Sequence, residues 1–394
     1  MKKVVIITPY FDPENFPINN FAYEIRKKKI NVDVITCLPN YRKKGLYKDY
    51  SYIGPYFEII NNVKIYRVPI IPRFSNSFLS ILIFYLSYFI FTSFFIFFYA
   101  LLNIGKIKHV ISFCGSPVYV GFFSSILALI TRATSSQWVQ DIWPEAIETT
   151  QGLNNKMIIK IISSLQSFMW NTSDIIFAQS NMLNVYLNKH LKNKKIFTLY
   201  NPVREDFNQL TIKKKLNDKT IYSYMGNIGG AQSIEDLLKA YLNSNNEFTE
   251  LHICGDGADL EYLKKNYDEK KIFWHGWINE NEMTNIIEKT DFFLLSLNNK
   301  GRQNYIIPSK LQTYLKNSRP VICLSTGAAN DLISSIKGGF VVKKDTQEEM
   351  ISTFNLAQEA NLECRNFMGN NNREYYENHF RQSVIVENFI KIIN

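Results

Sequence analysis

A glycine-rich segment in the second half of the chain has residue types that suit phosphate binding. Residues 226–233 read Gly-Asn-Ile-Gly-Gly-Ala-Gln-Ser, after an apolar run at 221–225 and before a helical pattern at 234–241. Glycines let a backbone approach a ligand closely, and the first turn of a helix presents unpaired N–H groups and a positive dipole end. The segment predicts a diphosphate site, with a purely structural turn as the alternative. Ser233, three residues before Asp236, is expected to cap the helix.

A lysine begins a second expected helix. The segment 302–310 leads from an apolar run that ends near Leu297 into a helix with Pro308 at its first turn. Lys310 then lies at a helix N-terminus, where a cation is unfavourable unless an anion lies between the two. This conflict predicts that Lys310 binds an anionic ligand, and the alternative is a lysine that faces solvent.

An aspartate follows one expected strand of the first half. Asp141 comes directly after the run 137–140, and open α/β sheets bind ligands at the carboxyl ends of their strands. A carboxylate at such a place can orient or deprotonate an acceptor hydroxyl. The alternative is that Asp141 caps a helix before Pro144.

Motifs for metal or serine chemistry are missing from the sequence. No two aspartates are separated by a single residue, no G-x-S-x-G occurs, and the five histidines form neither H-E-x-x-H nor another metal spacing; they lie at 109, 190, 252, 275 and 379. We therefore expect a phosphate-binding enzyme that holds no metal.

Short apolar runs rich in Phe, Ile, Val and Leu alternate with helical patterns along the whole chain. They lie at 4–8, 32–36, 63–68, 110–113, 137–140, 175–178 and 196–200, and then at 221–225, 251–254, 272–274, 292–296, 321–324 and 340–342. Such runs are typical of parallel strands covered by helices on both faces. Because 394 residues exceed the roughly 250–300 that one core supports, we predict two doubly wound α/β domains that meet near residue 202 and enclose a cleft.

The composition is that of a globular protein, with 46% hydrophobic and 20% charged residues. Five scattered cysteines exclude a disulfide framework and a thiolate zinc site, and we expect a reducing, cytoplasmic location. The net charge is +10, and residues 1–73 contribute +7 of it, with 13 Lys and Arg against 6 Asp and Glu. Basic runs at 26–29 and 42–44 could meet nucleic acid or an anionic membrane, or could simply be solvated.

One long stretch, 74–105, contains no charged residue. Its length suits a membrane span, but a crossing would separate strands of one domain, so we expect a monotopic or buried helix over 77–104. At 100° per residue its Ser, Thr and Tyr residues share one arc, opposite a Leu, Ile and Phe face. We predict that this apolar face docks on an anionic membrane; the alternative is that Ile83, Leu86, Ile90 and Phe94 pack on their own sheet.

Taken in order, a set of short motifs resembles a known family. They are D-I-W-P-E at 141–145, Y-N-P at 200–202, G-N-I-G-G-A-Q at 226–232, G-D-G at 255–257, H-G-W at 275–277 and P-S-K-L-Q-T-Y-L at 308–315. The chain resembles glycosyltransferase family 4 of GT-B fold, and within it the bacterial O-antigen and capsule branch that includes N-acetyl-L-fucosaminyltransferases. The resemblance implies two Rossmann-like domains facing across a cleft. It also implies retaining transfer, without a divalent metal or other cofactor, from a UDP-sugar such as an L-FucNAc donor to a polyprenyl-diphosphate-linked saccharide, at the cytoplasmic face of the bacterial inner membrane.

The resemblance also implies roles for particular residues. The catalytic residues are Asp141, Glu145 and Lys310. The donor-binding residues are Gly226, Asn227, Gly229, Gln232, Gly255, Gly276, Trp277, Ile278, Tyr305, Pro308, Ser309 and Lys310, and the acceptor-binding residues are Asn19, Asn40 and Tyr41. No residue is assigned to a metal, and no nucleic-acid partner is expected.

The chain departs from the family at three places, one of which is that residues 226–233 hold none of the Arg or Lys that many members carry near the glycine turn. Tyr305 and Thr313 stand where two glutamates usually hold the ribose and the sugar, and residues 16–20 replace a usual glycine pair. The expected domains are 1–202 for the acceptor, 203–373 for the nucleotide sugar, and a terminal helix, 374–394, that returns to the first domain. Two other functions stay open: a GT-B sugar-nucleotide epimerase or hydrolase, and a non-catalytic membrane-associated binding protein.

Overall fold

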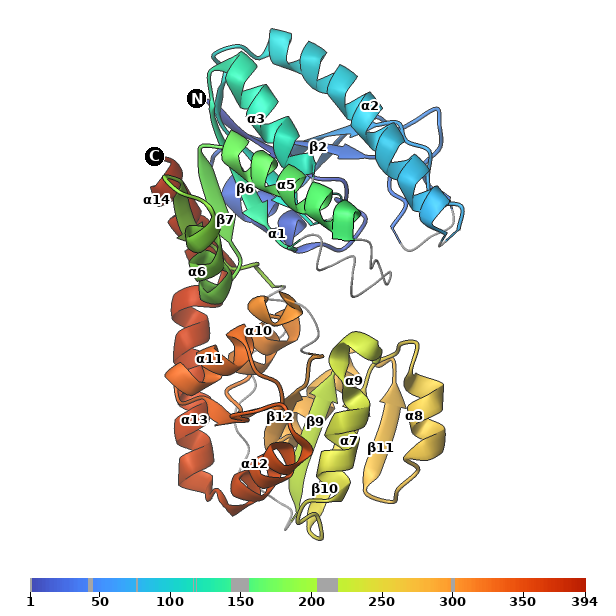
Figure 1. The fold of residues 1–394 in the computed structure, drawn as a ribbon, viewed down its shortest axis with the longest axis vertical. Helices are drawn as coiled ribbons and strands as arrows, with labels where there is room; N and C mark the ends of the chain where they lie inside the picture. The colour runs from blue at the N-terminus through green and yellow to red at the C-terminus, as the bar shows by residue number, and fades with distance from the viewer. Residues whose placement is uncertain are drawn as a thin grey trace. The chain divides into compact units, whose positions relative to one another are not determined.

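The computed structural model describes residues 2–41, 45–75, 77–115, 117, 119–142, 156–203, 219–298 and 302–394. The chain forms two compact units (Figure 1). The first unit comprises Met1–Pro202 and Gln382–Asn394, and the second comprises Val203–Arg381. The border between them lies at the expected position, whereas the terminal segment enters the first unit from Gln382 and not from Glu374.

The first unit is built on an eight-stranded sheet with the order β3-β4-β2-β1-β5-β6-β7-β8. The strands are β1 (Lys3–Ile7), β2 (Val32–Cys37), β3 (Phe57–Ile60), β4 (Val63–Val68), β5 (Ile107–Cys114), β6 (Thr134–Val139), β7 (Ile175–Ala178) and β8 (Lys195–Thr198). All pairs are parallel except β3 with β4. The seven expected strands are confirmed with small shifts of their ends. Strand β3 was not predicted; it turns into β4 at Asn61 and Asn62, both at positive φ.

Six described helices cover this sheet. They are α1 (Pro17–Lys27), α2 (Phe78–Leu102), α3 (Val120–Thr131), α5 (Lys156–Thr172), α6 (Asn181–His190) and α14 (Gln382–Ile393). Alternate residues of a strand face opposite sides of the sheet, so Val4 and Ile6 pack with α1 and α14 while Val5 and Ile7 pack with α2 and α3. The last helix therefore belongs to the core of the first unit.

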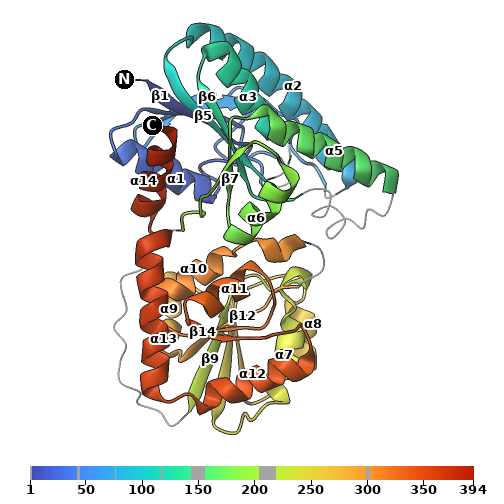
Figure 2. The same cartoon turned by 60° about the vertical axis from the view of Figure 1, so that its left-hand side comes forward.

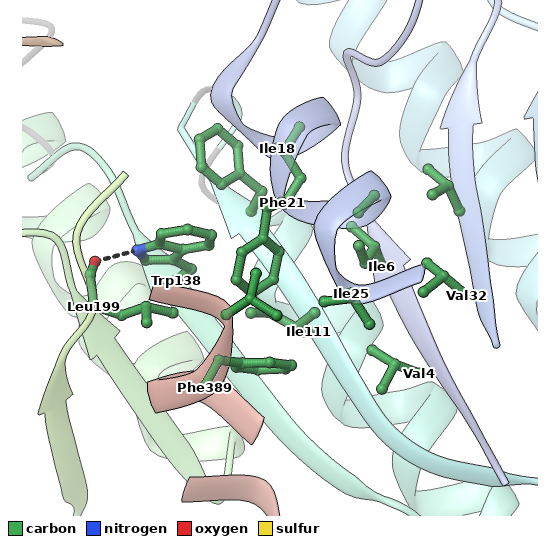
Figure 3. Packing of buried hydrophobic residues seen from close by; sticks show 14 of the residues in the cluster. Val4, Ile6, Ile18, Phe21, Ile25, Val32, Ile111, Trp138, Leu199 and Phe389 are labelled. Carbon is green, nitrogen blue, oxygen red and sulfur yellow. Dashed lines mark hydrogen bonds between the residues drawn. The ribbon is translucent and has the colours of Figure 1, made fainter. Parts of the chain in front are cut away.

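Aromatic packing secures that last helix (Figure 3). The Phe21 ring on α1 lies 5.0 Å from the Phe389 ring on α14 and 4.8 Å from the Trp138 ring on β6, measured between ring centroids. The buried Trp138 donates its Nε1–H to the carbonyl oxygen of Leu199 at 2.9 Å. The indole thus fills the core and satisfies its one polar group.

Helix α2 confirms the expected apolar helix, with Ser77 accepting the N–H of Ser80 as its cap. The orientation differs from the packed alternative, because Leu86, Ile90 and Phe94 are exposed and not packed on the sheet. The arc of Ser80, Ser87, Tyr88, Thr92 and Tyr99 is buried instead.

The second unit has a six-stranded sheet with the order β11-β10-β9-β12-β13-β14, and its strands pair in parallel. The strands are β9 (Thr220–Met225), β10 (Thr249–Cys254), β11 (Ile272–Gly276), β12 (Phe292–Leu295), β13 (Val321–Cys323) and β14 (Gly339–Val341). The helices are α7 (Ile234–Leu242), α8 (Leu260–Asn266), α9 (Glu280–Lys289), α10 (Ser309–Lys316), α11 (Ala328–Ser335), α12 (Gln347–Glu359) and α13 (Leu362–Tyr375). All six expected strands are confirmed.

Both sheets reverse their strand order at one point. In the second unit the chain builds outward from β9 through β10 and β11, and then from β12 on the other side. The first unit repeats this order with β1, β2 and β4 on one side and β5 on the other. Doubly wound sheets bind ligands at the carboxyl ends of the strands beside such a switch point. The loops after β9 and β12, and after β1 and β5, are therefore the places for functional side chains.

Candidate active site

The loops after β9, β10 and β11 hold one another through their main chains. The Gly226 N–H donates to the Cys254 carbonyl oxygen at 2.9 Å, and the Ile228 N–H donates to the backbone carbonyl oxygen of Asp256 at 2.9 Å. The Gly255 N–H donates to the Gly276 carbonyl oxygen at 2.7 Å. A Cβ atom on Gly255, where φ is +142°, would lie 1.8 Å from the Gly226 carbonyl oxygen. Gly255, expected to touch the donor, is thus required for this close approach of two loops.

Lys310 meets the glycine turn from a distant part of the chain. It is the second residue of α10, after Pro308 at the cap position. Its Nζ donates to the Tyr224 hydroxyl at 2.6 Å and lies 4.3 Å from the Tyr224 ring centroid. A Cβ atom on Gly226 would lie 3.3 Å from that Nζ. The structure therefore brings together Gly226 and Lys310, which the sequence had singled out separately.

Lys310 is largely buried without a charged partner among the residues that the structure describes. Within the described part of the chain, no carboxylate pairs with its Nζ, and α10 has no acidic residue in its first turn. Burial lowers the pKa of Lys310 to about 7. A bound anion would restore the charged form, because an adjacent negative charge favours the ammonium. The helix start and Lys310 together form a place where an anion is stabilised from two sides.

The N-terminus of α7 is less suited to an anion. Ser233 adopts a left-handed conformation with φ 45° and makes no side-chain cap, so the expected capping bond is wrong. A short 3-10 turn, Gly230–Gln232, precedes it. Glu235 and Asp236 occupy the first turn of α7 and line one pocket together with Asp259. Three carboxyl groups disfavour a diphosphate there, so of the two expected helix ends α10 is the one whose charge fits.

The other expected donor residues lie at the same edge of this sheet. Asn227 donates its Nδ2–H to Gln232 Oε1 at 2.8 Å, on the exposed rim of the turn. Trp277, with 80% of its surface exposed, and the partly buried Ile278 follow β11. Tyr305 ends the 3-10 turn Arg302–Tyr305, shortly before Pro308 and the exposed Ser309. An exposed indole beside a ligand loop offers a surface for a planar base.

In the first unit, Asp141 lies two residues beyond the end of β6, as expected. Burial raises the pKa of its carboxyl to about 6. Its carboxylate has no hydrogen-bonding or charged partner among the described residues; the nearby loop after β5 approaches closely enough that a Cβ atom on Gly115 would lie 3.6 Å from Asp141 Oδ2. Glu145, and the possible helix cap before Pro144, lie outside the described residues.

The expected acceptor residues surround a carboxylate that the sequence did not reveal. The buried Glu14 accepts the N–H groups of Asn40 at 2.7 Å and Tyr41 at 2.6 Å. Asn19 donates its Nδ2–H to the Glu14 carbonyl at 2.7 Å, and Asn40 donates to the Leu38 carbonyl at 3.0 Å. Burial raises the pKa of Glu14 to about 7. Asn19 and Asn40 are themselves buried, and their side-chain amides bond to nearby carbonyl groups of the chain. The Glu14 carboxylate is the group that joins the loops after β1 and β2, because it accepts the backbone N–H groups of Asn40 and Tyr41.

Nothing in the spacing of Glu14 distinguishes it from a solvated loop carboxylate, because the N–H groups of Asn40 and Tyr41 that it accepts lie 26 and 27 residues away. Among the residues that the structure describes, no group of three or more His, Cys, Asp or Glu is placed to hold a metal ion. The candidate site residues therefore fall into two sets, one at the carboxyl ends of the strands of each unit.

Comparisons with known proteins identify similar glycosyltransferases. Residues 204–375 match the family model of glycosyl transferases group 1. An uncharacterised glycosyltransferase of Methanocaldococcus jannaschii, MJ1069, is 22% identical over 411 residues, covering 99% of this chain and 97% of that protein. Anabaena HepE in complex with UDP is similar in structure, with a TM-score of 0.70 at 9% identity over 99% of both chains. WaaG, a glycosyltransferase involved in lipopolysaccharide biosynthesis, has a TM-score of 0.65 at 12% identity over 99% of both chains.

These likenesses confirm the expected GT-B fold, with two α/β domains on parallel sheets. The family match and the relative support a glycosyltransferase, and so disfavour a non-catalytic binding protein. Membership of family 4 and of the fucosaminyltransferase branch stays a prediction.

Proposed function

We propose that the protein transfers a sugar from a nucleotide diphosphate sugar to an acceptor hydroxyl, with the donor diphosphate held at Lys310. The observation that carries the proposal is the placement of Lys310 Nζ beside the Gly226 turn and at the start of α10, without a carboxylate partner in the described chain. HepE, which is similar in structure, is described as a complex with UDP. A UDP-sugar is therefore the donor class that we propose.

The finer proposal follows the sequence resemblance. It names an N-acetylated deoxyhexosamine such as L-FucNAc as the sugar, a polyprenyl-diphosphate-linked saccharide as the acceptor, and O-antigen or capsule synthesis as the process. The description of WaaG as a lipopolysaccharide biosynthesis enzyme and the exposed apolar face of α2 support a membrane-linked acceptor. We further propose retention of anomeric configuration and a peripheral place on the cytoplasmic face of the membrane.

In this proposal each of these residues has a separate role in the transfer reaction. The bond between the anomeric carbon and the diphosphate oxygen breaks, and the acceptor oxygen bonds to that carbon. Protonated Lys310 stabilises the negative charge that develops on the departing diphosphate. Asp141, ionised above its pKa of about 6, accepts a hydrogen bond and then the proton from the acceptor hydroxyl. Trp277 and Ile278 line the place of the base.

Two donor contacts that are usual in the family that the sequence resembles are replaced in this proposed site. Tyr305 and Thr313 stand where glutamates usually hold the ribose and the sugar. Thr313 directs its hydroxyl to the Ser309 carbonyl at 3.5 Å, within its own helix. We therefore propose that the hydroxyl of Tyr305, and not a carboxylate, contacts the donor, and that no divalent metal assists departure of the diphosphate.

The experiment measures release of nucleoside diphosphate from a panel of sugar nucleotides, with and without a lipid-linked saccharide acceptor, in the presence of EDTA. The proposal expects acceptor-dependent release from a UDP-sugar and unchanged rates in EDTA. Interconversion of donors without acceptor would instead identify an epimerase, and activity that EDTA removes and metal restores would contradict the metal-free proposal.

A further inference from the structure

Helix α2 buries most of its polar side chains, together with Phe84, Ile96 and Ala100, and exposes most of its other apolar ones. On its buried side the Ser87 hydroxyl accepts the Ile71 N–H at 2.9 Å, and the Tyr99 hydroxyl donates to Asp33 Oδ2 at 2.5 Å. The exposed side carries apolar residues along its whole length, among them Leu79, Leu86, Ile90, Phe94, Phe97 and Leu101. A helix that packs only on its own domain has the opposite distribution. The exposed side of α2 is therefore built for an apolar partner.

Two neighbouring helices extend this surface. Helix α3 contacts both α2 and α5, and the three lie side by side in both views (Figures 1 and 2). Helix α5 exposes the stripe Met157, Ile161, Leu165 and Phe168, while its Gln166 is buried, and α3 exposes Leu129. We call the exposed residues of these three helices the outer apolar face. Exposed apolar side chains gathered on neighbouring helices in this way are typical of an interaction site.

The charges on and around this face are mainly positive. Helices α2, α3 and α5 contain no Asp or Glu. Exposed Lys156 and Lys160 lie on α5, exposed Lys106 and Arg132 follow α2 and α3, and one exposed carboxylate, Asp174, follows α5. The outer apolar face thus combines apolar side chains with nearby cations.

The connections of α2 exclude a span across a bilayer. The helix links β4 to β5, which are strands of one continuous sheet, so its two ends stay on the same side. It is long and apolar enough to cross by composition alone. Its 25 residues instead extend about 37 Å along the surface of the domain.

We propose that the outer apolar face docks the first unit onto an anionic lipid bilayer, with α2 and α5 lying in the plane of the interface. Stable peripheral binding needs two signals, here the apolar side chains and the neighbouring Lys and Arg residues. A second copy of the chain fits less well. In a two-fold interface the same patch meets itself, so the cations would meet cations, whereas anionic headgroups complement them.

The test compares flotation of the full-length protein with vesicles of phosphatidylethanolamine and phosphatidylglycerol. The variant Ile90→Lys with Phe94→Lys is expected to reduce the bound fraction about tenfold or more, with an unchanged melting transition. The matched control is Leu356→Lys with Phe367→Lys, which places the same two charges on exposed apolar positions of α12 and α13. We expect this control to float like the parent.

A second variant, Lys156→Glu with Lys160→Glu, tests the electrostatic signal without touching the apolar residues. It should weaken flotation on phosphatidylglycerol vesicles and lose the advantage of these vesicles over phosphatidylcholine. Flotation of both variants at the parental level would overturn the proposal. So would a parent that ignores vesicles but forms dimers that the Ile90 and Phe94 variant dissociates, because the face would then bind a second copy. The docking proposal is independent of the donor chemistry, and UDP binding in each variant separates the two.

Discussion

The two units share one strand order but differ in what their outer helices present. In the second unit α7 buries Ile234, Leu237, Leu238 and Tyr241, and turns Glu235 and Lys239 outward as an ion pair 3.0 Å apart. In the first unit α2 reverses this arrangement. The first unit carries 23 Lys and Arg against 11 Asp and Glu, a net charge of +12, whereas the second carries 22 against 24, or −2. The shared sheet topology therefore places the loops after the strands at corresponding positions in the two units. The outer helix surfaces differ in charge and apolar exposure, and so suit different binding partners.

The key titratable residues of the two units also differ. Burial raises the pKa of Asp141 in the first unit to about 6, and burial lowers the pKa of Lys310 in the second unit to about 7. Each shift favours the neutral form. In the proposed reaction the first unit accepts the proton and the second unit binds the anion, and each role can be tested alone.

The largest effect is expected from Lys310 in the second unit. Lys310→Ala should lower kcat/KM about 100- to 1000-fold, because one donor of charge stabilisation in a water-excluded site contributes on the order of 2.7–4 kcal/mol. Lys264→Ala, on the surface of α8, is the control and should retain the parental rate. An unchanged kcat/KM in Lys310→Ala would remove Lys310 from the site.

A second substitution at the same position, Lys310→Met, tests how this lysine affects stability. Because the folded pKa of Lys310 lies below its unfolded value of 10.5, the unfolded chain binds more protons between about pH 7 and pH 10.5. The free energy of unfolding therefore gains from this group as pH rises through that range. Lys310→Met should remove this contribution and should melt no lower than the parent at pH 6, since it no longer buries an ammonium.

Asp141 in the first unit is expected to have the next largest effect. Asp141→Asn should lower kcat about 100-fold, as for loss of a general base, while leaving UDP affinity unchanged. In the parent, kcat/KM should fall below pH 6 as Asp141 becomes protonated and above pH 7 as Lys310 loses its proton. The acidic limb should be absent from the variant. A variant that fails to fold would favour the helix-cap interpretation of Asp141.

The glycine loops of the second unit are expected to affect stability. Gly255→Ala should destabilise this unit by about 1–3 kcal/mol, because its φ is +142° and its Cβ would collide with the Gly226 carbonyl. Gly230→Ala is the matched control, since a Cβ there meets no atom within 4 Å. Urea unfolding measures both. Equal midpoints would show that the close approach of the two loops is not required.

A smaller effect is expected from Trp277. Since its ring is exposed, Trp277→Ala should leave the melting temperature unchanged and weaken UDP binding by about 1–3 kcal/mol, the range for loss of one stacked base. Trp277→Phe should retain most of the affinity. Parental affinity in Trp277→Ala would place the base elsewhere.

Sequence patterns predicted the sheets well because both are buried, and buried parallel strands leave continuous apolar runs. They missed β3, whose residues Phe57 and Ile59 are exposed at the sheet edge. Lys310 and Gly226 were each recognised, since a helix start and a glycine turn have local signatures. Their contact, through Tyr224, joins residues 84 positions apart and has no such signature.

The same limit explains the other differences. Glu14 could not be recognised because it binds backbone groups of a different loop. The prediction of a side-chain cap by Ser233 was wrong because a 3-10 turn precedes α7 and Ser233 adopts a left-handed backbone conformation. For α2 the two faces were identified correctly, but only the fold decides that the polar face is the buried one. Periodicity separates the faces of a helix and does not orient them.

The most direct test of the donor site in the second unit is calorimetric titration of UDP into the full-length protein and into Lys310→Ala, at several pH values between 6 and 9. We predict that the parent binds UDP with an affinity that falls as pH rises above 7, because binding then requires proton uptake by Lys310. Lys310→Ala should bind weakly, without this pH dependence. Equal UDP affinity in the two proteins across the pH range would contradict the assignment of Lys310 to the donor diphosphate.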